Sequence, residues 1–327
     1  MTGFRVSSGL VALALLVLAF VWHIMVGAKT IPIGTVLDAF LSYDETVFDH
    51  VVIRDLRLPR ALVAIAVGAG LAVAGALMQG VTRNPLADPG LLGLLAGASF
   101  AVVLGTVTGF ISPVAIPAIA AVGALVAATI VWAVASAVPG GATPMTLVLA
   151  GAAVTAFLGA LTAIMLLVDQ TSLDALRIWL TGTLTARSGN TGPWAAAWLV
   201  VGLLIALGVA RQVTALAMGD ETAVGLGVNV AKLRMAILGS VIALTAAAVA
   251  LAGPMGFVGL VVPHFVRLIA GYDYRVIIPG SVLVGATFML LADIAARMLL
   301  APVEISTGLI TALLGAPFFV WIVRMRL

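Results

Sequence analysis

The chain has 327 residues, of which 63% are hydrophobic and 9% are charged, and its mean hydropathy is +1.26. Because a soluble domain carries about 25% charged residues, this composition excludes a soluble protein and predicts an integral membrane protein. The net charge of +3 is spread over single basic residues between apolar runs, which does not favour nucleic-acid binding. The lack of cysteine excludes disulfides and thiolate chemistry.

The apolar residues are mostly Ala, Leu, Val and Gly, and 35 residues are glycines. Small residues let membrane helices approach closely, which favours a helical bundle over a barrel. Ten apolar stretches are long enough, or nearly so, to cross a bilayer as helices. In chain order they are 9–27, 61–81, 91–111, 114–138, 145–168, 193–210, 235–253, 255–270, 276–295 and 307–323. We therefore predict an all-α integral membrane protein with about ten transmembrane helices in a single polytopic domain, 1–327.

The orientation follows from the number of helices and from the basic residues. The first range lacks a convincing cleavage site after it, so we interpret it as a retained helix and not as a signal peptide. Ten helices place both termini on one side, and the positive-inside rule slightly favours the cytoplasm. The polar stretch RNPLADPG (83–90) then forms a cytoplasmic corner, because Asn-Pro and Asp-Pro end helices.

Charged residues near the outer ends of two ranges form local pairs. Arg57 and Arg60 flank Pro59 at the start of the second range, and their spacing of three places both on one helical face. By themselves they indicate snorkelling at a helix end. At the end of the ninth range, Asp293 precedes Arg297 by four residues, so the two can pair within a helix.

The fifth range and the stretch after it carry structural patterns. Ala152, Ala156 and Ala160 recur at fourfold spacing, which favours a helix-packing stripe. The segment 172–184 has the spacing of a short amphipathic helix at the outer surface, with Trp179 suited to the membrane interface.

The segment GDETAVGLGVNVAKLR (219–234) is the longest strongly polar stretch predicted to be cytoplasmic. Asp220 and Glu221 suit the positive N-terminal end of a short helix. Two glycines then interrupt the segment, and two basic residues close it before the seventh range. The residues alone are equally typical of an ordinary cytosolic loop with snorkelling basic ends.

The stretch LRLPRALVAIAVGAGLAVAGALMQGVTRNPLADPGLLGLLAGASF (56–100) resembles the permease subunits of binding-protein-dependent ABC importers for iron–siderophore complexes, haem and cobalamin. The likeness continues in order through 219–234, GPMGFVGLVVPHFVRLIAGYDYR (253–275), LLADIAAR (290–297) and LLGAPFFVWIVR (313–324). It implies a type II ABC importer permease fold, with two permease subunits and a path along their interface. It also implies two separate ATPase subunits and a periplasmic or lipid-anchored binding protein.

The resemblance assigns roles to the charged segments. Arg57, Arg60 and Arg297 match positions that accept acidic residues of the binding protein, and a guanidinium suits bidentate pairing with a carboxylate. The loop 212–234 matches the cytoplasmic segment that couples to the ATPase. Its coupling residues are Gly219, Asp220, Glu221, Gly225, Gly227, Lys232 and Arg234.

The resemblance also places a gate and a path. The stretch PGGATPMT (139–146) matches the cytoplasmic gate, with gate positions at Pro144, Met145 and Thr146. Cobalamin permeases of this family carry small hydroxyl residues there, so the Pro-Met pair departs from their pattern. The fifth range matches the span that lines the path, and the predicted lining residues are Thr155, Thr162 and Met165.

No catalytic or metal-binding constellation is recognisable in the sequence. The three histidines lack paired-ligand spacing, and no Gly-x4-Gly-Lys-Ser/Thr phosphate loop occurs. We therefore predict no enzyme activity and no cofactor in this chain, with ATP and Mg²⁺ bound by the partner ATPase subunits.

The predicted function is import of a ferric siderophore across the bacterial cytoplasmic (inner) membrane by ATP-driven alternating access. The regions 27–40 and 82–93 are most similar to ferric-catecholate permeases, which favours a heterodimer with a second permease subunit. Haem or cobalamin import by the same machinery is the alternative. An ion-coupled secondary transporter is disfavoured, because the middles of the ten ranges lack charged residues.

Overall fold

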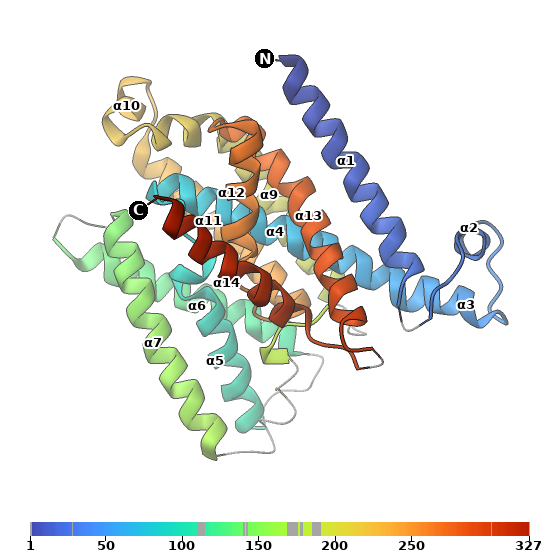
Figure 1. The fold of residues 1–327 in the computed structure, drawn as a ribbon. Helices are drawn as coiled ribbons and strands as arrows, with labels where there is room; N and C mark the ends of the chain where they lie inside the picture. The colour runs from blue at the N-terminus through green and yellow to red at the C-terminus, as the bar shows by residue number, and fades with distance from the viewer. Residues whose placement is uncertain are drawn as a thin grey trace.

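The computed structural model describes residues 2–27, 29–109, 115–139, 141, 143–168, 176, 179–184, 191–301 and 303–326. Within these residues the chain is helical and contains no β-strand. The long helices form one bundle, with the first helix and two short helices at one side of it (Figure 1).

Each of the ten predicted ranges coincides with one helix. The helices are α1 (Thr2–Met25), α4 (Leu58–Thr82), α5 (Leu94–Val107), α6 (Ile116–Ala137), α7 (Pro144–Val168), α9 (Thr191–Ala217), α11 (Val230–Ala252), α12 (Val258–Ala270), α13 (Tyr274–Met298) and α14 (Thr307–Arg326). In the described part of the chain, seven helical stretches are long and apolar enough to cross a membrane, and α5, α12 and α14 are shorter apolar helices. The predicted all-α membrane fold is confirmed.

Helix α4 lies at the centre of the bundle, where it packs against α9, α11, α12 and α13. Its backbone touches two neighbours at glycines. A Cβ atom at Gly68 would overlap the carbonyl oxygen of Gly285 in α13, and one at Gly75 would overlap that of Gly259 in α12. These contacts need glycine on both helices, since any side chain would hold the backbones apart.

Helices α5, α6 and α7 form a second group of neighbours, and Gly97 of α5 meets Gly123 of α6 in the same backbone-to-backbone manner. Helix α7 buries few of its side chains within this chain. Ala152, Ala156 and Ala160 are all exposed. The predicted alanine stripe is therefore present, but it does not pack against the described part of this chain.

The segment 29–56, between α1 and α4, contains more regular structure than the sequence indicated. It holds α2 (Ile33–Leu41), α3 (Phe48–Val51) and the π-helical turn η1 (Val52–Arg57), which runs directly into α4. None of the ten predicted ranges covers this segment, because short helices leave no long apolar run. The π turn has a local cause: Pro59 cannot donate a backbone hydrogen bond, and the Leu58 N–H bonds to the Ile53 carbonyl five residues back.

The corner after α4 ends the helix as predicted. Arg83 adopts the left-handed conformation (φ 52°), and the Asn84 and Asp88 side chains each accept a hydrogen bond from the amide two residues on. A short 3₁₀ helix, η2 (Pro89–Leu92), follows before α5.

The predicted amphipathic helix 172–184 lies partly outside the described residues, which omit 169–175, 177 and 178. Two of its apolar residues, Leu176 and Trp179, are buried in the main core at 1% and 2% exposure. The expectation that Trp179 faces the membrane interface is wrong, because its indole fills space inside the bundle.

Candidate docking, coupling and gating sites

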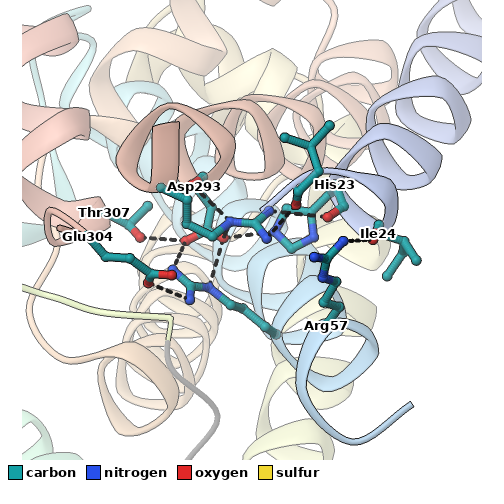
Figure 2. A network of polar contacts seen from close by, with 9 residues as sticks. His23, Ile24, Arg57, Asp293, Glu304 and Thr307 are labelled. Carbon is teal, nitrogen blue, oxygen red and sulfur yellow. Dashed lines mark hydrogen bonds and ion pairs between the residues drawn. The ribbon is translucent and has the colours of Figure 1, made fainter. Parts of the chain in front are cut away.

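Asp293 of α13 is the centre of a buried polar network at the ends of four helices (Figure 2). Its carboxylate is 0% exposed and accepts hydrogen bonds from Arg60 Nε (2.9 Å) and Nη2 (3.0 Å) and from Thr307 Oγ1 (2.7 Å). His23 Nε2 lies 2.8 Å from Oδ2, and Arg297 Nε lies 3.3 Å from the same oxygen. The predicted pairing of Asp293 with Arg297 is confirmed, and the network joins α1, α4, α13 and α14.

Arg57 and Arg297 are turned inward, at 7% and 5% exposure. Both guanidinium groups donate to backbone carbonyls at and just beyond the C-terminal end of α1, where a helix has no internal donors left. The acceptor residues are His23, Ile24, Met25, Val26 and Lys29. These two arginines therefore hold the end of α1 against α4 and α13.

Arg60 reaches closest to the surface of the three predicted docking arginines. Its Nη1 donates to Glu304 Oε2 at 2.9 Å, and the Glu304 side chain is 48% exposed. The structure thus brings Arg57, Arg60 and Arg297 together in one place, although two of them are committed to internal acceptors. Their role in docking stays a prediction.

The predicted coupling segment, 219–234, folds as its polar pattern indicated. Asp220 begins the short helix α10 (Asp220–Gly225), preceded by Gly219 at φ 127° and followed by Gly227 at φ 80°. Both φ values favour glycine. Asn229 then caps α11, because its Oδ1 accepts a hydrogen bond from the Lys232 amide at 3.0 Å.

Asp220 joins the coupling segment to the two helices beside it. Its Oδ2 lies 2.8 Å from Arg234 Nη2 in α11, and its Oδ1 lies 3.3 Å from Arg83 Nη2 at the end of α4. The central helix is thereby connected to α10 by a side-chain contact. Arg83 was predicted as a corner residue, and nothing in its neighbouring sequence indicated Asp220 as its partner.

The predicted gate residues lie at the start of α7. Thr146 Oγ1 accepts from the Thr143 amide at 2.8 Å, and the Thr143 hydroxyl accepts from the Thr146 amide at 3.2 Å. Thr146 therefore belongs to a reciprocal helix cap. Met145 is 68% exposed, and Pro144 is the first residue of α7. Residues 140 and 142 of the same stretch lie outside the described part of the chain.

The predicted lining residues of α7 face different surroundings. Thr155 is exposed beside the alanine stripe. Thr162 is half-buried and donates to the Leu158 carbonyl at 2.8 Å, while Met165 is half-buried against the core. Of the three, Thr155 presents its side chain most openly.

A model of the FecCD transport family matches residues 15–325. The chain belongs to the FecCD transport family. Among curated FecCD-type permeases, the probable siderophore transport system permease protein YfiZ of Bacillus subtilis is 43% identical, over 88% of this chain and 87% of its own. The hemin transport system permease protein HmuU of Yersinia pestis is 41% identical, over 82% of each chain.

A solved structure supports the same assignment. It is described as an inward-facing metal-chelate type ABC transporter, and it matches with a TM-score of 0.83 and 28% identity, covering 98% of this chain and 99% of that one. Further relatives are named for Fe(3+)-citrate and cobalamin import. As a FecCD member, the chain is a multi-pass, non-catalytic permease subunit of a binding-protein-dependent ABC transporter of the iron-chelate class.

Proposed function

We propose that this FecCD chain imports a ferric siderophore across the cytoplasmic membrane. The observation that carries the proposal is the 43% identity to the siderophore permease YfiZ over most of both chains. The hemin permease HmuU is nearly as similar at 41%, so haem is the second candidate substrate, followed by cobalamin. In this proposal the binding protein selects the substrate.

The proposed energy source is ATP hydrolysed by two separate ATPase subunits, which hold the Mg²⁺. Both termini and the segment 219–234 face the cytoplasm in this proposal, and the binding protein docks on the opposite side. Arg60 and Glu304 offer the exposed part of the outer network for that contact. Asp293 and the buried arginines keep Arg60 in place.

Helix α4 is placed to connect the two ends of this mechanism. Its outer end carries Arg57 and Arg60, and its inner end contacts α10 through Arg83 and Asp220. A helix of this length spans about 37 Å at 1.5 Å per residue, and a packed helix moves as a rigid element. We propose that closure of the ATPases displaces α10 and that α4 carries the displacement towards the docking surface.

The translocation path is proposed to run along α7, between this chain and a second permease subunit of different sequence. The exposed alanine stripe and Thr155 support a surface that meets a partner, since small side chains allow close approach. Met145 and Thr146 lie at the cytoplasmic end of the same helix, where the gate is proposed.

The test is uptake in cells that lack this chain. Radiolabelled iron is supplied on a catecholate, a hydroxamate and a citrate carrier, with labelled haem and cobalamin in parallel. We expect uptake of one siderophore class to be lost and to be restored by the wild type. Lost haem or cobalamin uptake with normal siderophore uptake would instead assign one of those substrates, and unchanged uptake of all five would contradict the proposed cargo.

A further inference from the structure

A cavity of about 850 Å³ opens at the end of the molecule that carries α10. Its walls come from the last turns of α9, the turn between α10 and α11, the first turns of α11 and the start of α13. Three basic side chains line it, and each comes from a different helix: Arg211, Lys232 and Arg275. The amides of Gln212 and Asn229 lie in the same wall, and none of the residues that line the cavity is acidic.

Two of the three cations have no counter-charge. Arg275 is paired with Asp273 at 2.9 Å. In contrast, the side chains of Arg211 and Lys232 make no hydrogen bond or ion pair within the described residues, and both residues are exposed. The cavity therefore presents a positive field to any anion that enters it.

The depth of Arg211 and Lys232 in the membrane indicates which kind of anion would bind in the cavity. From Gly192, at the other end of the α9 span, to Arg211 is about 29 Å at 1.5 Å per residue. From Ala252 back to Lys232 along α11 is about 30 Å. The hydrocarbon core of a bilayer is about 30 Å thick, so with Gly192 and Ala252 placed at one boundary of the core, both charges reach the opposite boundary, beside the lipid phosphates. We expect an ATPase subunit to meet the chain mainly at α10, with Lys232, itself a predicted coupling residue, at the border of that contact.

The rest of the wall suits a lipid as well. Met218 and Leu226 line the cavity and are 70% and 65% exposed, so they offer apolar surface beside the cations. Basic pockets between transmembrane helices bind anionic headgroups because a phosphate pairs with the cations while the acyl chains stay in the hydrocarbon. We propose that this cavity binds the headgroup of an anionic phospholipid, held by Arg211 and Lys232. The proposal does not depend on the transported substrate.

The experiment uses the full chain in nanodiscs of phosphatidylcholine with increasing phosphatidylglycerol of the same acyl composition. Lipid retained after release is counted by native mass spectrometry, and the melting temperature is recorded in parallel. The test variant is R211Q combined with K232Q. The matched control is R324Q, which removes an exposed basic residue at the end of α14, outside the cavity.

We expect the wild type and R324Q to retain phosphatidylglycerol over phosphatidylcholine and to melt higher in its presence. The double variant is expected to bind phosphatidylglycerol at least roughly tenfold more weakly, since each basic residue near the surface contributes about a factor of five to ten. Retention without headgroup preference, or equal loss in R324Q, would overturn the proposal. Equal protection by 10 mM inorganic phosphate would assign the site to a soluble anion. Unchanged lipid retention with lost ATPase binding in the double variant would assign the cavity to the ATPase interface.

Discussion

The Asp293 carboxylate is buried in the helical bundle, where His23, Arg60 and Arg297 surround it. These nitrogen-bearing side chains offset the cost of burying its negative charge. Two of its partners, Arg60 and Arg297, would be left as buried cations if the negative charge were removed. Breaking a buried ion pair from one side is costly because the remaining charge keeps its desolvation penalty.

We therefore expect D293N to destabilise the chain by about 3–5 kcal/mol, or to prevent its folding. The measurement is thermal unfolding of the purified chain in detergent. The control is E304Q, which breaks the exposed end of the same network and is expected to cost less than about 1 kcal/mol. Equal losses in the two variants would show that Asp293 is not the centre of the network.

Asp88 is expected to make the stability of the chain depend on pH. Asp88 lies in the corner between α4 and α5, and burial raises the pKa of its carboxyl to about 6. Because the usual pKa is 3.8, the folded state holds more protons than the unfolded state between these values, and stability falls as pH rises from about 4 to about 6. The loss is at most about 3 kcal/mol. D88N keeps an oxygen to accept from Gly90 N–H, and its melting temperature is expected to vary less over this range.

At the scale of elements, the glycines of α4 decide how closely helices meet. G75A would place a methyl group against the backbone of Gly259, which has no flexible side chain to move aside. We expect a loss of about 1–3 kcal/mol. G239A is the matched control in α11, where nothing lies within 4 Å of the added Cβ, and it is expected to raise stability by up to about 1 kcal/mol. Melting of both variants in one detergent tests this, and a stable G75A would contradict the observed helix contact.

The contact between α4 and α10 leads to a prediction about transport. D220N removes the charge that Arg83 and Arg234 share, so we expect several-fold lower uptake while the ATPase subunits still co-purify. The control is E221Q, one residue along, whose carboxylate makes no hydrogen bond or ion pair with the described residues. Partial recovery of uptake by combining D220R with R83D would identify the pair as the connection. Equal uptake in D220N and E221Q would mean that the segment 219–234 acts without the contact between Asp220 and Arg83.

For the whole molecule, the sequence was sufficient to predict the seven helices long enough to cross a membrane and the three shorter apolar helices α5, α12 and α14, because bilayer thickness requires apolar runs of a minimum length. Local spacing also predicted the pair Asp293–Arg297 and the start of α10 at Asp220. It could not predict that His23, Arg60 and Thr307 meet at Asp293, because these residues come from three other helices and no local pattern records their contact. The short helices α2 and α3 were missed for a related reason, since α2 packs against α1 and α3, and α3 packs against α2 and η1, and neither forms a long apolar run.

The paired glycines of α4 limit which parts of this transporter can move separately. Turning α4 by one residue, about 100°, would bring a side chain to the place of Gly68 or Gly75 and push α12 and α13 away. Helices α4, α12 and α13 therefore cannot rotate or slide past one another, and we expect them to move as one rigid body. In α7, a Cβ atom added at Gly159 would meet nothing within 4 Å, and Ala152, Ala156 and Ala160 are exposed. We expect the hinge of the transport cycle to lie between α7 and the rigid body formed by α4, α12 and α13.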